Sequence, residues 1–170
     1  MGFFEKLFAK EEPVQEVQTE PGVLYLPMEG EVISLADIGD GVFSEGILGQ
    51  GCGVLPAGET VYAPANGTIS QVAETRHAVG IMTEDGVEVL IHVGMDTVDM
   101  NGDGFTVLVK PDQKVKCGQP LLRFSTAKIK AAGHPTTTAF VVTNTDDLPA
   151  VTLLGTGKKA KLEAVITTKA

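Results

Sequence analysis

Two of the three histidines, His77 and His92, lie where a hairpin would bring them together. The intervening sequence includes GIMTEDGVEVLI, in which Asp85-Gly86 between apolar runs is a strong signal for a two-residue type I′ turn. That turn predicts a register in which Val79 pairs with His92 and His77 is a diagonal neighbour on the same face. Diagonal neighbours lie about 7–8 Å apart at the backbone, so the two imidazoles could converge on one small ligand.

A pair of neutral imidazoles supports two kinds of chemistry. The pair could bind Zn²⁺, although a catalytic zinc requires three protein ligands and the third is not evident. Alternatively, one imidazole acts as a nucleophile and the other donates a hydrogen bond to the charge that develops. Thr75 shares the parity of His77, and Asp96 shares the parity of His92 if the strand continues, so both could flank the pair. The spacing alone does not choose between these two chemistries.

The strand that ends at His92 has two different faces. Because side chains alternate along a strand, Glu88 and Leu90 share the face of His92, which we predict to be the outer one. The opposite face is wholly apolar and is the predicted core side; it consists of Val87, Val89, Ile91 and Val93.

The elements that must position these residues are short runs rich in Val, Ile, Leu and Thr, which alternate with Gly- and Pro-containing breaks from Gly22 onward. This texture is typical of an all-β protein. We predict an antiparallel β-sandwich or barrel-like fold with Greek-key or jelly-roll connections and one or two short helices. One helix is expected in STAKIKAAGHP, with Ser125 or Thr126 as N-cap and Gly133 at its end. The third histidine, His134, follows this helix, where its interaction with the helix dipole predicts a structural role.

Composition and charge exclude several classes of protein. The 170 residues carry a net charge of −9, so nucleic acid is not an expected partner. No apolar run is long enough to span a bilayer, and the N-terminus lacks the features of a signal peptide. Cys52 and Cys117 match no CxxC or metal-binding spacing, so we expect free thiols in a reducing cytosol, although a disulfide between them stays open.

The chain divides into a tail and one domain. Residues 22–170 form the predicted β-sandwich domain, and residues 1–21 form an amphipathic tail with an acidic, Pro-bounded linker. If residues 1–10 form a helix, Lys6 and Lys10 lie outside its apolar stripe. We therefore expect residues 1–10 to make weak contact with a membrane surface. The apolar stripe consists of Phe3, Phe4, Leu7 and Phe8.

The residues around both histidines resemble a known family. ETRHA, which contains His77, and HVGMDTV, which begins with His92, are its two histidine motifs within residues 63–105. Over residues 22–168 the chain is similar to the glucose-type enzyme IIA of the bacterial phosphoenolpyruvate:sugar phosphotransferase system. The start, MGFFEKL, also resembles the amphipathic tail of the free-standing form. The resemblance implies an antiparallel β-sandwich that accepts phosphate from phospho-HPr and passes it to the IIB domain of a sugar permease.

The resemblance also implies a role for each residue of the two motifs. His92 would be phosphorylated on Nε2, while the Gly94 carbonyl would hold its Nδ1 proton. His77 would hydrogen-bond the phosphoryl group, with Thr75 fixing its tautomer, and Asp96 would flank the site.

An apolar rim around the site is the predicted docking surface for partners. Ala73, Val79 and Leu90 stand where the family resemblance leads us to expect aromatic residues, so the rim should be apolar but less aromatic. Exposed apolar residues around a shallow site exclude water and hold a partner in place. The predicted rim consists of Phe43, Ile47, Leu48, Val79 and Leu90.

Two hypotheses of function follow. The first is a phosphohistidine relay: a cytoplasmic monomer at the inner face of the cell membrane, with HPr and a IIB domain as partners and no obligatory cofactor. The second is a zinc-dependent hydrolase on a related β scaffold that uses His77 and His92, but such enzymes need an HxH pair and position 94 is Gly. A zinc ion on the two histidines in a regulatory complex is a further expectation. The sugar, the permease and regulation of other proteins stay open.

Overall fold

The computed structural model of the chain describes residues 17–170. The predicted tail, residues 1–10, therefore lies outside the described residues. Within the described part, no helix is long and apolar enough to cross a membrane.

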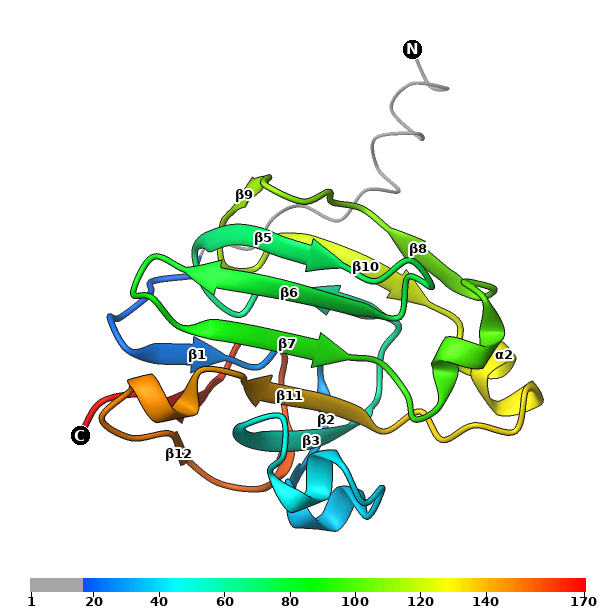
Figure 1. Cartoon of the computed structure of the whole chain (residues 1–170), viewed down its shortest axis with the longest axis horizontal. Helices are drawn as coiled ribbons and strands as arrows, with labels where there is room; N and C mark the ends of the chain where they lie inside the picture. Colours follow the sequence, from blue (N-terminus) through cyan, green and yellow to red (C-terminus); the bar gives the residue numbers. More distant parts are fainter. Residues whose placement is uncertain (1–16) are drawn as a thin grey trace.

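One eight-stranded antiparallel sheet forms the layer of the molecule that faces the viewer in Figure 1. The order places β11 between β3 and β7, so strands that are far apart in the sequence are neighbours. From one edge to the other the sheet contains β13 (Gly157–Lys159), β2 (Gly30–Ser34), β3 (Gln50–Pro56), β11 (Thr138–Val142), β7 (Glu88–His92), β6 (Ala78–Thr83), β5 (Gly67–Val72) and β9 (Lys114–Val115).

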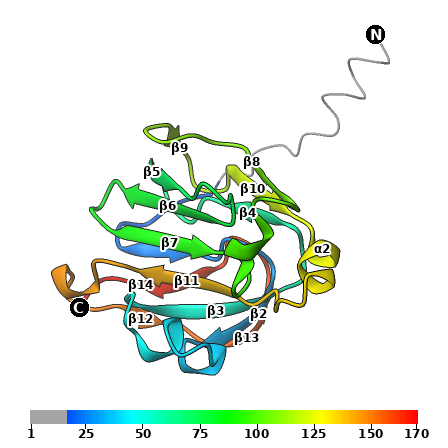
Figure 2. The ribbon, with the colours of Figure 1, turned by 45° about the vertical axis from the view of Figure 1, so that its right-hand side comes forward.

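Two three-stranded sheets lie behind the large sheet (Figure 2). The core fills the space between the layers, where Leu24, Leu122 and Ile166 of the small sheets pack with Ile91 and Phe140 of the large one. The prediction of an antiparallel β-sandwich is therefore confirmed. The small sheets contain β1 (Val23–Tyr25), β14 (Ala164–Thr167) and β12 (Thr152–Leu153), and β4 (Thr60–Tyr62), β10 (Pro120–Phe124) and β8 (Phe105–Val107).

The predicted helix is α2 (Thr126–Ala131), and short 3₁₀ turns supplement it. The Ser125 side chain accepts a hydrogen bond from the backbone N–H of Lys128, as expected of an N-cap. The chain leaves the helix through Gly133, which has φ 85°. The 3₁₀ turns are η1 (Ala36–Ile38), η2 (Phe43–Glu45), η3 (Thr97–Met100) and η4 (Thr145–Asp147).

The hairpin between β6 and β7 has a different register from the one predicted. Val79 pairs with Ile91 and not with His92, because the connecting loop has three residues instead of two. The Thr83 N–H donates to the Val87 carbonyl at 2.9 Å, and only Gly86 in this loop has a positive φ. A type I′ turn would require a positive φ at Asp85 as well, so the predicted turn type is wrong.

The corrected register changes the position of one predicted rim residue. Val79 shares the inner face with Val89 and Ile91 and is fully buried in the core. It cannot belong to a docking rim, and that prediction is wrong. The predicted core face of β7 is confirmed, because all four of its members are buried, namely Val87, Val89, Ile91 and Val93.

Candidate functional site

His77 and His92 lie together at one end of the β6–β7 hairpin. Their ring centroids are 4.7 Å apart and the rings are nearly perpendicular, at 83°. His92 is the last residue of β7, whereas His77 directly precedes β6 and follows Arg76, which has φ 62°. The predicted proximity is therefore present, although the partner of His92 in the ladder is Ala78, so the two histidines are not the predicted diagonal pair.

The backbone after β7 fixes the tautomer of His92. Nδ1 of His92 lies 2.8 Å from the Gly94 carbonyl oxygen. A carbonyl can only accept a hydrogen bond, so Nδ1 carries the proton and Nε2 keeps its lone pair. Gly94 has φ 75°, and a Cβ there would clash with the Thr97 side chain and lie 3.1 Å from the Pro135 carbonyl oxygen. Glycine is therefore the residue that this turn requires.

Thr75 is the partner of His77. Its hydroxyl oxygen lies 2.7 Å from Nδ1 of His77. When the hydroxyl donates this hydrogen bond, the proton of the imidazole resides on Nε2, which becomes a donor. His77 is buried, and its ring lies edge-on to Phe105 at 6.4 Å between centroids. The structure thus brings Thr75, His77 and His92 together, as the sequence predicted.

Both imidazoles are neutral at physiological pH. Burial, and next the charge of neighbouring His77, lower the pKa of His92 to about 4 despite the hydrogen bond to Gly94. Burial also lowers the pKa of His77, against a raising contribution from the backbone of Thr75. An unprotonated Nε2 on His92 is the form that can act as a nucleophile.

Two acidic residues line the same depression as His92. Asp96 was predicted here; it is exposed and adopts φ 60° at the start of η3. Asp40 was missed, and its charge raises the pKa of His92 slightly against the larger effects above. Burial alone would raise the pKa of Asp40, but hydrogen bonds from the backbone of Ser44 and Phe43 outweigh this and lower it. Asp40 accepts hydrogen bonds from the backbone N–H groups of Phe43 and Ser44 in η2, and this local role says nothing of its nearness to His92.

Apolar residues lie in and beside the depression that His92 lines. Phe43 is buried and its ring lies 5.0 Å from that of His92, while Leu90 is half-buried on the same face. Ile47 and Leu48 are exposed, and Leu48 lines the depression, whose volume is about 500 Å³. We use the name docking rim for these residues together with two exposed residues that the sequence reasoning missed. The docking rim consists of Phe43, Ile47, Leu48, Leu90, Val42 and Val98.

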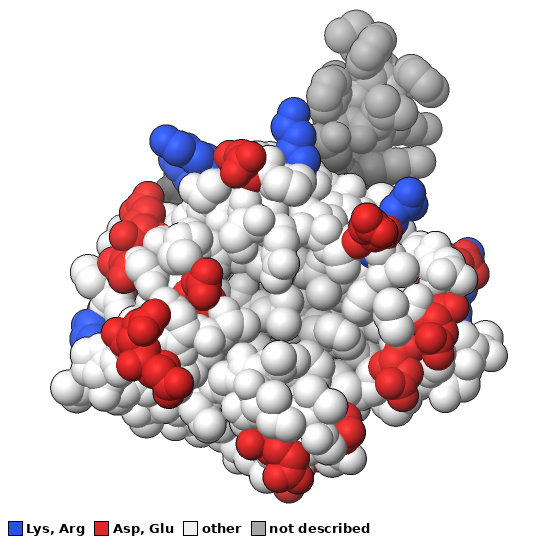
Figure 3. All heavy atoms as spheres, viewed as in Figure 1, with Lys and Arg blue, Asp and Glu red and all other residues white. Residues whose placement is uncertain are grey.

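The outer face around this site carries little charge. In Figure 3 the central part of the face is free of charged side chains, and the Asp and Glu side chains gather toward its margins. An uncharged centre with a charged margin is the arrangement of a surface that binds other proteins.

The described residues offer no complete metal site. Within residues 17–170, no group of three or more His, Cys, Asp and Glu side chains could hold a metal ion. A zinc ion on His77 and His92 would therefore need further ligands from a partner. Cys52 and Cys117 are free and buried in separate apolar clusters.

Comparison with known proteins identifies clear relatives. Residues 22–148 match the family model described as phosphoenolpyruvate-dependent sugar phosphotransferase system, EIIA 1. The chain is 36% identical over 151 residues to the glucose-specific EIIA component of Haemophilus influenzae, a match that covers 89% of each protein. It is 39% identical over 144 residues to the β-glucoside-specific EIIBCA component of Bacillus subtilis; this match covers 85% of the chain but only 24% of that longer protein.

A solved structure is also similar to this chain. The glucose permease IIA of Mycoplasma capricolum superposes with a TM-score of 0.78 at 29% sequence identity. The match covers 91% of the present chain and 100% of the other one. None of these comparisons supports the hydrolase hypothesis.

Proposed function

Because the chain belongs to the EIIA 1 family of the phosphoenolpyruvate-dependent sugar phosphotransferase system, we propose that His92 is the residue that carries its phosphoryl group. The protein is a phosphotransferase component of that system. The observation that supports His92 is its hydrogen bond to the Gly94 carbonyl, which leaves Nε2 unprotonated beside a second imidazole.

The transfer needs no net proton movement at His92. The Nε2 lone pair attacks the phosphorus of phospho-HPr, a new N–P bond forms, and the bond to the donor breaks with its electron pair returning to the donor nitrogen. The Nδ1 proton stays on His92, where the Gly94 carbonyl stabilises the positive charge that the ring acquires. The same steps in reverse order release the phosphoryl group to the nucleophile of a IIB domain.

His77 assists without carrying the phosphoryl group. With the Thr75 hydroxyl donating to its Nδ1, His77 presents an Nε2–H that can bind a phosphoryl oxygen. A preorganised donor of this kind stabilises charge that shifts during transfer. Its burial holds it in place before the phosphoryl group arrives. Asp96 and Asp40 add negative charge to the margin of the site and suit a partner with basic residues.

Phosphorylation of single-histidine variants tests the assignment. The protein is incubated with phosphoenolpyruvate, enzyme I and HPr, and the acid-labile adduct is measured. We expect His92→Gln to remove the adduct and the control His134→Gln, which lies outside the site, to keep it. An adduct on His92→Gln at the wild-type level would overturn the assignment.

The docking rim is the proposed binding surface for HPr and for the IIB domain of a glucose-type permease. Its exposed apolar residues around a half-buried nucleophile can exclude water while two reacting groups align. Transfer from the phosphorylated protein to a glucose-type and to a β-glucoside-type IIB domain identifies the permease. Faster transfer to the β-glucoside-type domain would contradict the glucose assignment.

We further propose that the protein works in the cytoplasm at the inner face of the membrane, where residues 1–10 make weak contact with anionic lipids. The support is the sequence alone, with four apolar residues and two lysines in one short segment. Co-sedimentation with anionic vesicles is expected for the full chain and not for a chain that begins at residue 17. Equal sedimentation of both chains would contradict a membrane role.

A further inference from the structure

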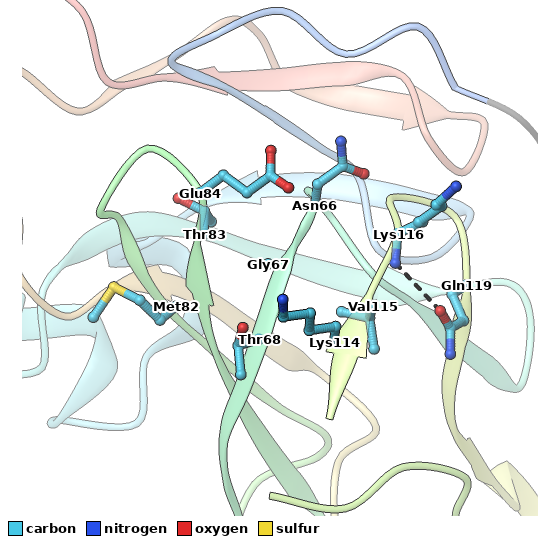
Figure 4. Close-up of a pocket in the computed structure, with 10 residues that line it drawn as sticks. All are labelled: Asn66, Gly67, Thr68, Met82, Thr83, Glu84, Lys114, Val115, Lys116 and Gln119. Atoms are coloured by element: carbon cyan, nitrogen blue, oxygen red, sulfur yellow. Dashed lines mark hydrogen bonds between the residues drawn. The ribbon is translucent and has the colours of Figure 1, made fainter. Parts of the chain in front are cut away.

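A second depression lies at the far end of the same hairpin. It has a volume of about 580 Å³ and is bounded by β5, β9 and the end of β6 (Figure 4). Its lining includes the two lysines of the β9 region, Lys114 and Lys116, together with Thr68, Met82 and Glu84. We call it the β9 pocket. The mechanism of phosphoryl transfer does not use it.

The strand register arranges one wall of the β9 pocket as a row across three strands. Thr68 of β5 pairs with Lys114 of β9 on one side and with Met82 of β6 on the other. Cross-strand partners share a face of the sheet, so a cation and an exposed apolar side chain flank a hydroxyl. Met82 is 37% exposed, so its apolar side chain is available to an occupant of the pocket.

The charge of the β9 pocket contrasts with that of the protein. Within residues 17–170 the ion pairs are Lys128–Asp103 and Lys159–Glu163, so neither Lys114 nor Lys116 has an ion-pair partner there. The chain carries a net charge of −9, whereas Figure 3 shows Lys and Arg side chains, with an acidic side chain between them, along the margin where β9 lies. Lys114 and Lys116 outnumber Glu84 among the charged residues of the lining, so the pocket suits an occupant that combines acidic and apolar groups.

The described chain begins beside this pocket. Val17 packs against the cluster that contains Cys117, the residue after Lys116. Asn66, which lines the pocket, accepts a hydrogen bond from the Cys117 N–H at 2.8 Å and donates to the Thr19 hydroxyl at 3.4 Å. Val17, the first described residue, thus lies close to the wall of the pocket.

We propose that residues 1–16 of this same chain bind the β9 pocket. Residues 11–16, EEPVQE, supply three carboxylates to the two lysines, and the phenylalanines of residues 3–8 supply apolar surface to cover Met82. The six residue-to-residue steps from Glu11 to Val17 can span roughly 20 Å when extended, so the lysines lie within reach. Because Lys114 and Lys116 are exposed, the contact should weaken as salt is added.

Docking in the β9 pocket would leave the histidines accessible. Met82 pairs with Glu88, four residues before His92, which corresponds to roughly 13 Å along the strand. The docked segment would hide its apolar stripe from anionic lipids without covering the docking rim. The proposal therefore makes membrane contact and docking on the body mutually exclusive, while phosphorylation continues in both states.

Backbone amide chemical shifts of the full chain and of a chain that begins at residue 17 test this inference. We expect differences at Thr68, Met82 and Lys114 that are independent of protein concentration and disappear in 1 M salt. In the double variant Lys114→Glu, Lys116→Glu these differences should fall at least five-fold. The control variant Lys130→Glu, Lys158→Glu changes charge by the same amount elsewhere and should retain them.

Three outcomes would overturn the proposal. Differences confined to residues 17–20 would show only the effect of removing covalent neighbours. Pocket differences that shrink on dilution would assign the pocket to the tail of a second copy. Pocket differences that persist in Lys114→Glu, Lys116→Glu would show that the lysines do not hold the segment. Phosphorylation by phospho-HPr, measured on the same samples, reports separately on the function of His92.

Discussion

The two ends of the β6–β7 hairpin are built differently from the same two strands. At the turn end, the left-handed backbone conformation falls on Gly86, where it costs no steric energy. At the histidine end it falls on Gly94 but also on Arg76, for which it is unfavourable by about 1–2 kcal/mol, and on Asp96, a residue type that tolerates it better. Within this hairpin, the residues other than glycine that adopt the left-handed conformation therefore lie at the end that orients His77 and His92, and the loop that only reverses the chain has none.

Replacing glycine by alanine should reduce stability and phosphorylation far more at the histidine end of the hairpin, at Gly94, than at the turn end, at Gly86. Gly94→Ala places a methyl group at φ 75° against Thr97 and the Pro135 carbonyl. We expect a loss of about 2–5 kcal/mol in the free energy of unfolding, from left-handed strain plus overpacking. The turn that holds Nδ1 of His92 must move, so phosphorylation by phospho-HPr should fall at least a hundred-fold in the fraction that remains folded. Denaturation curves and adduct formation on one sample check both, and wild-type values of both would contradict our account of Gly94.

The second histidine should affect one half of the reaction. His77→Ala removes a donor to the phosphoryl group but leaves Nε2 of His92 unprotonated, so the protein should still accept phosphate. Transfer onward to a IIB domain should slow by about 10²–10³, the effect of losing one preorganised donor. Single-turnover kinetics measure each step, with His134→Ala as control. Unchanged onward transfer in His77→Ala would rule out the proposed role.

An acidic residue should disturb partner binding at one end of the hairpin only. Leu48→Asp puts a charge into the docking rim, and we expect the Kd for HPr to rise by about ten-fold, as for loss of an interface contact. Met82→Asp puts the same charge at the turn end, on an exposed side chain, and should leave the Kd unchanged. Titration calorimetry measures both. An equal effect of the two variants would place the interface elsewhere.

The pH dependence of stability should come from the histidine end. The pKa of His92 is about 4 in the folded protein and about 6.5 in the unfolded chain, so only the unfolded chain binds the proton between these values. The free energy of unfolding should therefore fall as the pH falls from 6.5 to 4. In His92→Gln the fall should be smaller, although His77 still contributes because burial lowers its pKa too. Urea denaturation at several pH values tests this, and parallel curves for the two proteins would contradict it.

The smallest effect belongs to the turn end. No atom lies within 4 Å of a Cβ built at Gly86, so Gly86→Ala adds strain without a clash. We expect the free energy of unfolding to fall by about 1–2 kcal/mol and the rate of phosphorylation to stay at the wild-type value. A slower phosphorylation rate would mean that the two ends are coupled through the strands.

The sequence predicts the layers and faces of the fold better than its register. Alternation from Val87 to Val93 is a local property, and it correctly predicts the buried face of β7. The turn type depends on distant contacts, because the Asn144 side chain bonds the Gly86 carbonyl and the Glu88 N–H. The Asp85 carboxylate also accepts from the Gly22 N–H, so two remote segments select a three-residue loop over the predicted one.

In the candidate site, too, contacts between residues close in the sequence are predictable, and contacts made through the fold are not. The pairing of Thr75 with His77, and of His92 with Gly94, joins residues two apart, and the two histidine motifs carry these contacts. Asp40 comes to the site from a separate loop, through the packing of β3 against β11 and of β11 against β7. Topology of that kind has no signature in the residues around Asp40.

The two outermost strands of the large sheet, β9 and β13, both carry lysines, Lys114 on one and Lys158 and Lys159 on the other. An edge strand offers unpaired peptide groups to any other extended chain, and positive side chains repel a like-charged edge before hydrogen bonds can form. The lysines on both edge strands therefore oppose edge-to-edge pairing of two copies of the sheet. The eight-stranded sheet can thus keep two unpaired edge strands without aggregating.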